Sequence, residues 1–236
     1  MTRRIVALGG GGFSNDPFDP VGRRLDSLVL SYAPVTRPRI CFIPTASGDA
    51  ESYTLKFYRA YSERADASDL SLFTRPRREA LREFILEQHI VYVGGGNTVN
   101  MLAVWREHGL DAILREAWES GVVMAGISAG MSCWFESAAT DSFGDDQLRM
   151  VPALGLVAGT ACAHYSNVPY RRSEFQRLIR GGAAAGIAAD DGVALIYADR
   201  ELEEAVSVSD DAFAYRIRLD ADGITEEPIV PRILPD

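Results

Sequence analysis

The chain has 236 residues, of which 47% are hydrophobic and 24% charged, a balance typical of one globular domain with a sizeable core. The net charge of −9 argues against a nucleic acid or an anionic membrane as the main partner. The three cysteines are too widely spaced for a disulfide framework or a CxxC metal site, and no apolar run approaches the roughly 20 residues of a membrane span. We therefore expect a single domain over residues 1–236 in the reducing cytoplasm.

Short runs rich in Val, Ile and Leu alternate with helix-length segments along most of the chain. The runs are nearly continuous in hydrophobicity, as in strands buried on both faces of a parallel sheet. They are RIVALGG, RICFIPTAS, HIVYVGGG, GVVMAGIS and GVALIYA. The helical segments are residues 19–33, 50–65, 77–88 and 97–120. This order predicts an α/β fold in which a mostly parallel sheet is flanked by helices, a three-layer sandwich.

From about residue 201 onward, the segments EEAVSVS and AYRIRLD, separated by turn residues, predict a short antiparallel β tail. Glycines and polar residues recur where the predicted strands end, at residues 9–12, 45–48, 94–98 and 126–130. The carboxyl ends of parallel strands line the ligand crevice of an open sheet. We therefore expect a functional site at this edge.

The sequence GISAG at residues 126–130 places Ser128 between a predicted strand and a predicted helix. In this context the G-x-S-x-G pattern indicates a nucleophile elbow, a sharp turn that exposes the serine hydroxyl above the sheet. Small neighbours relieve crowding at the strained apex. The structural alternative is that Ser128 only caps the following helix.

A nucleophilic serine needs a base, and the chain has three histidines. His89 precedes a strand and His108 closes a helix before a glycine, so both are interpreted as structural. His164 follows a short apolar run and precedes a polar loop, on the side expected for Ser128. Its second ring nitrogen needs a carboxylate acceptor. The candidates are Asp190 and Asp191, at a turn between two apolar runs, and Asp141, nearer the elbow.

The segment GGGNT at residues 94–98 follows a strand and opens a helix, so its backbone N–H groups lie at a positive helix terminus. One of them, together with the N–H of Ala129, could stabilise an oxyanion. A phosphate-binding turn is the alternative, but no Walker lysine follows, since Lys56 is the only lysine. The early stretch ALGGGGFS lacks the third glycine of a dinucleotide fingerprint and is interpreted as a tight loop at the crevice rim.

Together these residues resemble the peptidase E (α-aspartyl dipeptidase) family of serine peptidases, which adopt the class I glutamine amidotransferase-like fold. The matching pieces are VYVGGGNTVNML, GISAGMSCWFES, TDSFG, CAHYSN and ADDGVAL, in the family's order. The chain order serine, histidine, acid differs from that of α/β-hydrolases, in which the acid precedes the histidine.

By position, the resemblance implies Ser128 as nucleophile, His164 as general base and acid, and Gly96 and Ala129 as oxyanion donors. Members with a glutamate as third triad residue carry it just before a glycine. Here that position holds Asp191, preceded by Asp190. Because aspartate is shorter than glutamate, either the backbone shifts, or Asp190 takes the role, or the acid is partly dispensable.

The implied reaction is peptide hydrolysis through an acyl-enzyme, without a metal or cofactor. The family's dipeptidases favour an amino-terminal aspartate, whose side chain needs a cation, and two arginines follow the histidine loop. The substrate-binding residues expected from the resemblance are Asn97, Thr98, Asp141, Arg171, Arg172 and Glu136.

Other functions stay open at this point. The antiparallel tail departs from the shorter enzymes, which leaves a carboxypeptidase or a cyanophycinase-like peptidase as alternatives. A catalytically silent module that binds a small ligand or a partner is the alternative from another class. A glutamine amidotransferase ranks last, because it would need a cysteine at the elbow, and Cys133 lies farther along the helix. We expect a short peptide as substrate, no nucleic acid or membrane partner, and leave a homodimer open.

Overall fold

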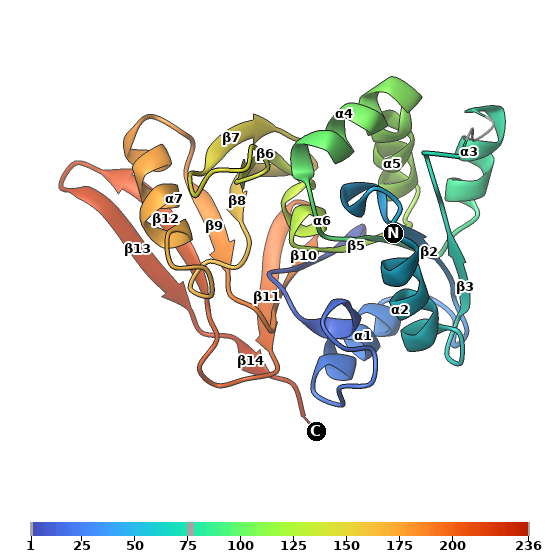
Figure 1. Cartoon of the computed structure of the whole chain (residues 1–236). Coiled ribbons are helices and arrows are strands. Elements are labelled where there is room, and N and C mark those ends of the chain that lie inside the picture. Colours follow the sequence, from blue (N-terminus) through green and yellow to red (C-terminus); the bar gives the residue numbers. More distant parts are fainter. Residues whose placement is uncertain (1, 75–77, 236) are drawn as a thin grey trace.

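The computed structural model describes residues 2–74 and 78–235, which form two β-sheets with helices packed on their faces (Figure 1). The larger sheet has eight strands in the order β14-β11-β10-β1-β5-β4-β2-β3. They are β1 (Arg4–Leu8), β2 (Arg39–Ile43), β3 (Asp66–Asp69), β4 (Ile90–Val93), β5 (Val123–Ile127), β10 (Val193–Ala198), β11 (Glu201–Ser207) and β14 (Arg232–Ile233). Strands β1, β5, β4, β2 and β3 are all parallel, which confirms the predicted, mostly parallel sheet.

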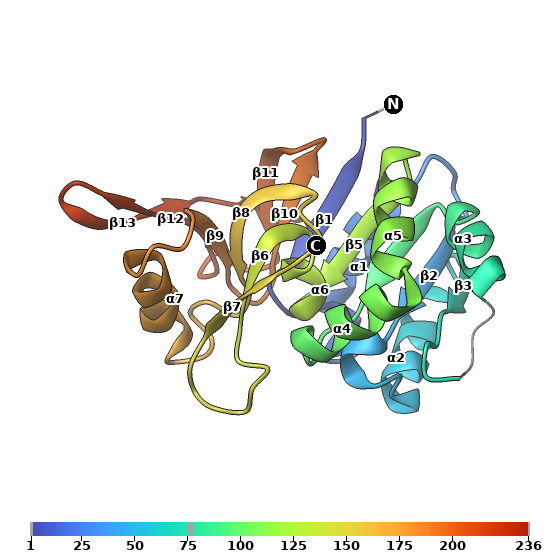
Figure 2. The same ribbon diagram turned by 90° about the horizontal axis from the view of Figure 1, so that it is seen from above.

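A second sheet of six strands, in the order β13-β12-β9-β8-β6-β7, lies beside the first (Figure 2). Its strands are β6 (Phe135–Thr140), β7 (Arg149–Pro152), β8 (Val157–Cys162), β9 (Gly186–Ala189), β12 (Ala214–Asp220) and β13 (Gly223–Ile229). Apart from the tail strand AYRIRLD, which is β12, the strands of this sheet are not predicted from the sequence. Three of its inner strands, FESAAT, VAGTAC and GIAA, are built of small residues rather than the Val, Ile and Leu runs that mark strands.

The prediction for GVALIYA is wrong in direction, because β10 runs antiparallel to β1, with Leu8 opposite Ala194 and Arg4 opposite Ala198. The chain crosses from β9 in the second sheet to β10 through residues 190–192. It therefore enters the main sheet at the edge where the parallel strands end and must run back. The predicted β tail is split: β11 joins the main sheet, whereas β12 and β13 form a hairpin that extends from the second sheet (Figure 1).

The helices are α1 (Gly22–Ser31), α2 (Glu51–Tyr61), α3 (Arg78–Leu86), α4 (Thr98–His108), α5 (Leu110–Glu119), α6 (Ala129–Ser132) and α7 (Arg171–Arg180), with the 3-10 turns η1 (Gly12–Ser14) and η2 (Thr45–Ser47). The predicted helix 97–120 is two helices. Gly109, with φ of 69°, takes the left-handed conformation that ends α4 and begins α5. None of the helices in the described part of the chain is long and apolar enough to cross a membrane.

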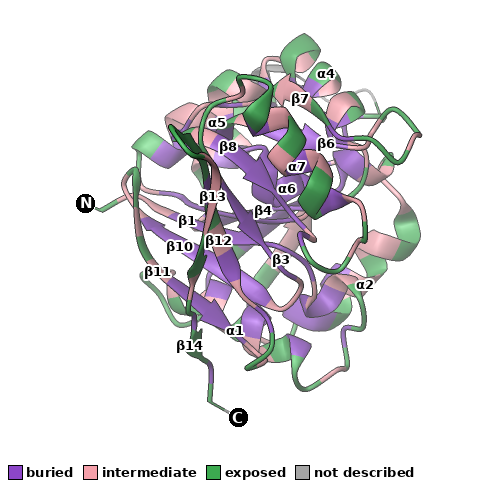
Figure 3. Cartoon of the chain, turned by 90° about the vertical axis from the view of Figure 1, so that its left-hand side faces the viewer, coloured by how far each residue is buried: buried purple, intermediate pink, exposed green. Residues whose placement is uncertain are grey.

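Alternate side chains of the main strands pack against opposite helical layers. Val6 and Leu8 of β1 face the layer that contains α1 and α2, while Ile5 and Ala7 face α3, α4, α5 and part of the second sheet. Helix α7 covers the other face of the second sheet. Figure 3 shows the buried strands between the more exposed helices and loops. The three-layer α/β sandwich of the peptidase E resemblance is therefore observed.

One carboxyl group is buried inside the α1–α2 layer. The Asp26 side chain on α1 has no exposed surface, and its Oδ1 accepts hydrogen bonds from the Tyr61 hydroxyl at 3.0 Å and from the Phe13 N–H at 3.4 Å. Burial raises the pKa of Asp26 from 3.8 to about 6, although these two hydrogen bonds act in the opposite direction. The folded protein therefore holds this proton more tightly than the unfolded chain does.

This raised pKa makes stability depend on pH in a defined direction. The contribution of protonated Asp26 is complete below the unfolded pKa and is lost as the pH rises through about 6. We expect the wild type to lose about 1–2 kcal/mol of unfolding free energy relative to Asp26→Asn between about pH 5 and about pH 8. Urea unfolding of both proteins measures the difference. Asp16→Asn, at an exposed carboxyl, is the control, and a difference that does not change with pH would contradict the prediction.

Candidate active site

Ser128 stands at the sharp turn between β5 and α6. Its backbone angles are φ 59° and ψ −111°, a strained conformation for a residue other than glycine. The turn is tight enough that a Cβ on Gly130 would lie 2.2 Å from the carbonyl oxygen of Val93, so only glycine fits there. The Ser128 hydroxyl makes no capping bond to α6. The cap alternative is therefore wrong, and the turn has the shape of a nucleophile elbow.

The Ser128 hydroxyl instead meets an imidazole. His164, two residues after β8, has its Nε2 2.8 Å from Ser128 Oγ and its Nδ1 hydrogen-bonded to Asp191 Oδ1. Ser128, His164 and Asp191 follow β5, β8 and β9, so two sheets contribute the carboxyl ends of their strands to one edge. His89 is remote from this group: it precedes β4, and its Nδ1 accepts the N–H of Arg39 at 2.9 Å.

The two neighbouring aspartates have different surroundings. Asp190 is 3% exposed, and its carboxylate accepts the backbone N–H groups of Ser166 at 2.8 Å and Phe213 at 3.1 Å. It therefore ties the loop after His164 to the segment before β12. Asp190 makes no hydrogen bond to His164 within the described residues, whereas Asp191 does. The geometry thus singles out Asp191 from the two aspartates that the sequence leaves open.

Two residues that the sequence analysis does not single out support Asp191. The Asn167 side-chain oxygen accepts the N–H of Asp191 at 2.7 Å, and Gly10 packs directly against the acid and the imidazole. A Cβ on Gly10 would lie 2.0 Å from Asp191 Oδ1 and 2.9 Å from His164 Cε1. The run of glycines after β1 is a signal for such a close approach, and Asn167 lies within the CAHYSN motif.

We expect Gly10→Ala to lower kcat by about 100-fold, because the added methyl group must displace the Asp191 carboxylate from the imidazole. Steady-state hydrolysis of a peptide that the wild type cleaves measures the effect. Gly181→Ala, at the end of α7, is the control, since a Cβ there meets carbonyl oxygens no nearer than 3.3 Å. Wild-type kcat in folded Gly10→Ala would show that the close packing is not required.

Backbone N–H donors lie next to the serine. Gly95 packs against Ser128, since a Cβ on Gly95 would lie 3.1 Å from Ser128 Cβ. The N–H of Gly95 donates to the Tyr53 hydroxyl at 3.2 Å. The N–H groups of Gly96 and Ala129 have no acceptor among the described residues. Both N–H groups are therefore available as donors, and that of Ala129 directly follows Ser128.

Asn97 and Thr98, predicted to bind substrate, both have partners within the protein. The Asn97 side chain caps α4 through the N–H of Asn100 at 2.9 Å and donates to the carbonyl oxygen of Ser142. The N–H of Thr98 donates to the Ser142 hydroxyl at 2.9 Å, and the Thr98 side chain is buried. Both residues therefore dock the loop after β6 onto the start of α4.

Asp141 and Arg171 form an ion pair close to His164. Arg171, 9% exposed, donates from Nη1 to the carbonyl oxygen of Ala163 at 3.0 Å and from Nη2 to Asp141. The Tyr170 hydroxyl donates to the same Asp141 oxygen at 2.6 Å. Burial acts to raise the pKa of Asp141, but the hydrogen bond from Tyr170 and the Arg171 charge bring it below its ordinary value.

The two remaining predicted residues have other partners. The Arg172 guanidinium is bound by Glu226 of β13 and lies over the ring of Tyr215, 5.5 Å from its centre. Glu136 stands at the beginning of β6, the opposite end from Asp141, and accepts the N–H of Gly159 at 2.8 Å. The structure therefore does not bring Glu136 into the site, because the carboxyl end of β6, and not its beginning, lies at the edge that carries Ser128 and His164.

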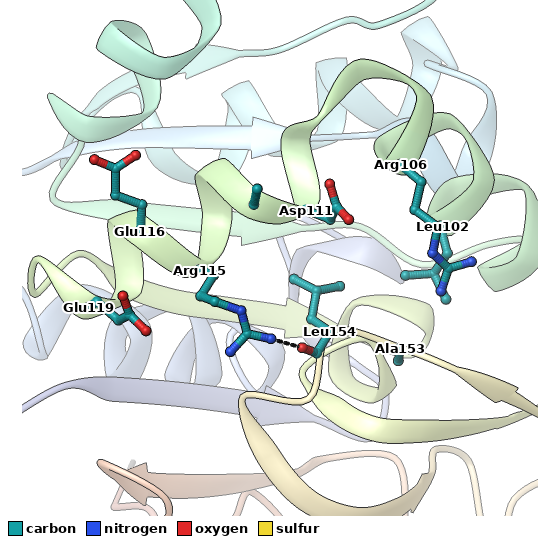
Figure 4. Close-up of a pocket in the computed structure, with 9 residues that line it drawn as sticks. Leu102, Arg106, Asp111, Arg115, Glu116, Glu119, Ala153 and Leu154 are labelled. Atoms are coloured by element: carbon teal, nitrogen blue, oxygen red, sulfur yellow. Dashed lines mark hydrogen bonds between the residues drawn. The ribbon is translucent and has the colours of Figure 1, made fainter.

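A separate cavity of about 430 Å³ lies between α4, α5 and the loop that follows β7 (Figure 4). Its charged side chains include Arg106 and Arg115, which donate to the carbonyl oxygens of Pro152 and Leu154. None of the predicted site residues lines this cavity. Its arginines hold the loop to the helices, so the cavity is not part of the arrangement around Ser128.

A match to a known family shows which proteins this chain is related to. A model of peptidase family S51 matches residues 5–205. The chain belongs to peptidase family S51. It is also 44% identical over 235 residues to the uncharacterized peptidase YgaJ of Bacillus subtilis (strain 168), covering 98% of this chain and 99% of that protein. The chain is therefore a serine-type peptidase, and the alternative of a glutamine amidotransferase is excluded.

Two solved structures share the fold at 18% sequence identity. A peptidase from an acI-B1 actinobacterium superimposes with a TM-score of 0.72 over 98% of this chain and 95% of its own. A Listeria monocytogenes EGD-e protein provisionally named a peptidase E superimposes with a TM-score of 0.67 over 89% of this chain and 100% of its own. These matches confirm the fold expected from the peptidase E resemblance, and the family model shows membership of peptidase family S51.

Proposed function

We propose that this S51 peptidase hydrolyses short peptides through an acyl-enzyme formed on Ser128. The observation that carries the proposal is the continuous hydrogen-bonded chain from Ser128 Oγ through His164 to Asp191. With Asp191 accepting the proton on Nδ1, the Nε2 lone pair of His164 faces the serine hydroxyl. His164 then takes the proton of Ser128 during attack on the peptide carbonyl and gives it to the leaving amine.

The N–H groups of Gly96 and Ala129 also support the proposal. Both are unpaired within the described residues, and Ala129 directly follows Ser128. Two backbone donors directed at the developing oxyanion stabilise the tetrahedral intermediate without any rearrangement. A water molecule, deprotonated by His164, completes the cycle by hydrolysing the acyl-enzyme.

We also propose that the enzyme prefers peptides with an amino-terminal aspartate, and the Arg171–Asp141 pair supports this preference. An aspartyl residue at the amino terminus carries an ammonium and a side-chain carboxylate close together. The pair offers one opposite charge for each, with Asp141 facing the ammonium and Arg171 the carboxylate. Arg171 is the better candidate because it binds the carbonyl oxygen of Ala163, next to His164, whereas Arg172 pairs with Glu226 of β13.

The test is hydrolysis of Asp-Leu, Glu-Leu, Ala-Leu and an amino-terminally blocked Asp peptide by the wild type, with labelling of Ser128 by a fluorophosphonate. Cleavage of Asp-Leu alone supports an aspartyl dipeptidase, and cleavage of the blocked peptide from its carboxyl end makes the protein a carboxypeptidase. Without labelling or turnover, the binding-module alternative stands.

Arg171→Met should lower kcat/KM for Asp-Leu by about 100-fold, because the cation proposed to bind the aspartyl carboxylate is lost. Hydrolysis of the same four peptides measures the effect, and Arg172→Met is the matched control.

The proposed setting follows from charge and cysteine use. A net charge of −9 supports a small peptide rather than a nucleic acid as the ligand. The free thiols of Cys41, Cys133 and Cys162 are all buried, in accordance with a reducing, cytoplasmic compartment. A homodimer stays a prediction that sedimentation of the purified chain can test.

A further inference from the structure

The loop that packs on the acid–base pair is held from outside the site. This segment, residues 9–15, is called the glycine loop below. Its Gly10 lies against Asp191 and His164, and the Gly10 carbonyl oxygen accepts the N–H of Gly192 at 2.9 Å. Any outward movement of the glycine loop would therefore remove the wall behind the Asp191 carboxylate.

The inner side of the glycine loop is fixed by α1. Asp26 accepts the N–H of Phe13, and its carboxylate is so close to Gly12 that a Cβ there would lie 3.0 Å from Oδ1. The Phe13 ring is fully buried and makes edge contacts with the rings of Phe57 and Tyr61 on α2. The middle of the glycine loop is thus anchored in the core.

The end of the glycine loop is fixed by the single lysine of the chain. Lys56 on α2 donates from Nζ to the carbonyl oxygens of Ser14 and Asn15, both at 2.9 Å. A compact ammonium with several rotatable donors suits two neighbouring carbonyls that point to one spot. Every other basic side chain in the sequence apart from histidine is an arginine.

The same helix also reaches the donor side of the site. Tyr53, three residues before Lys56 and so on the same face of α2, accepts the N–H of Gly95 next to Ser128. Burial raises the pKa of Tyr53 to about 12, so it stays a neutral phenol. Its ring also packs against Phe13, with centroids 5.6 Å apart. Helix α2 therefore contacts both the glycine loop and the loop that carries the Gly96 N–H.

We propose that Lys56 is a positioning residue for the peptidase reaction: it clamps the glycine loop to α2, and so holds Asp191 and His164 in register with the N–H donors beside Ser128. This role rests on the proposed function, because it acts through the Ser128–His164–Asp191 group. Lys56 itself binds only carbonyl oxygens of the glycine loop among the described residues.

The experiment compares Lys56→Met, Lys56→Arg and Arg37→Gln with the wild type. Arg37 is the matched control, since its guanidinium donates to three backbone carbonyls at the far end of α2, those of Ser62, Glu63 and Ala65. We expect Lys56→Met to lower kcat by about tenfold with KM within about twofold, because alignment and not binding is lost. Lys56→Arg should restore most of kcat, and Arg37→Gln should leave it unchanged.

Hydrogen exchange adds a readout that does not depend on turnover. Lys56→Met should raise deuterium uptake in the peptide that covers residues 9–15 while thermal unfolding shows the protein to be folded. If Lys56→Met does not fold, acetylation of the wild type with an N-hydroxysuccinimide ester replaces it: the amine attacks the ester carbonyl, N-hydroxysuccinimide leaves, and the ammonium becomes a neutral amide. Lys56→Arg, treated identically, controls for the amino terminus.

Wild-type kcat in folded Lys56→Met, or an equal loss in Arg37→Gln, would overturn the positioning role. Failure of the proposed function has a different signature. In that case Ser128→Ala would hydrolyse the peptide as fast as the wild type, and the positioning role would fall with it. If only the positioning role is wrong, Ser128→Ala is inactive while Lys56→Met keeps the wild-type rate.

Discussion

Ser128→Ala is expected to lower kcat for the cleaved peptide by about 10⁴-fold to 10⁶-fold, the loss typical of serine peptidases without their nucleophile. Without Oγ no acyl-enzyme forms, and His164 loses its partner at 2.8 Å. The N–H groups of Gly96 and Ala129 remain and leave a small residual rate. Initial rates with a single peptide, measured at saturating substrate, give the ratio.

The control for this prediction is Ser132→Ala, four residues farther on in α6, at a buried serine 3% exposed. It alters the same short helix without touching His164, so its kcat should stay within about twofold of the wild type. An active Ser128→Ala protein, free of wild-type contamination by mass spectrometry, would rule out acyl-transfer on this serine. Equal losses in both variants would point instead to damage of the turn.

Asp191→Asn is expected to lower kcat by about 10³-fold to 10⁴-fold, with a much smaller effect of Asp190→Asn. Asp191 accepts the Nδ1 proton of His164, and an amide in its place can present N–H donors that favour the wrong tautomer. Asp190 accepts two backbone N–H groups and makes no hydrogen bond to the imidazole within the described residues. Its loss should appear in the stability, at about 1–3 kcal/mol, rather than in kcat.

This pair of variants is matched in sequence position and chemistry, so it separates a role in catalysis from a role in folding. The measurements are kcat at a temperature where both proteins are folded, and urea unfolding of each. A larger loss of kcat in Asp190→Asn than in Asp191→Asn would contradict the assignment of the acid. Comparable activity of Asp191→Asn and the wild type would mean that His164 is oriented without a carboxylate.

Much of the main sheet follows from the local sequence. Runs such as IVAL in β1, ICFI in β2 and IVYV in β4 are apolar and buried at every position because they are covered on both faces. This pattern predicts the strands, the helices between them and their alternation. Gly109, where α4 ends, lies inside a segment that has the helical pattern on both sides, so the sequence predicts one continuous helix over 97–120. The only sequence signal of the left-handed residue that ends α4 is one glycine, which by itself does not predict that a helix ends.

Most of the second sheet is not predicted from the sequence, and the reason is physical. Its inner strands β6, β8 and β9 (FESAAT, VAGTAC and GIAA) are rich in Ala and Gly, residues that are depleted in strands, and lack continuous Val, Ile and Leu runs. Packing between the sheets and against α7 therefore decides that they are strands. The reversed direction of β10 follows from that sheet, since the chain arrives from β9 at the carboxyl edge.

The sequence by itself determined the elbow around Ser128, the choice of His164 and the glycine-rich segment 94–98. Each of these depends on a few neighbouring residues at the end of a strand. Only the tertiary structure decided between Asp190 and Asp191. Asp190 directly follows β9 and accepts the N–H groups of Ser166 and Phe213, whereas Asp191 lies in the turn before β10, which brings its carboxylate to His164. The support of that acid by Gly10, Asn167 and the Lys56 clamp joins segments far apart in the sequence, which no local pattern encodes.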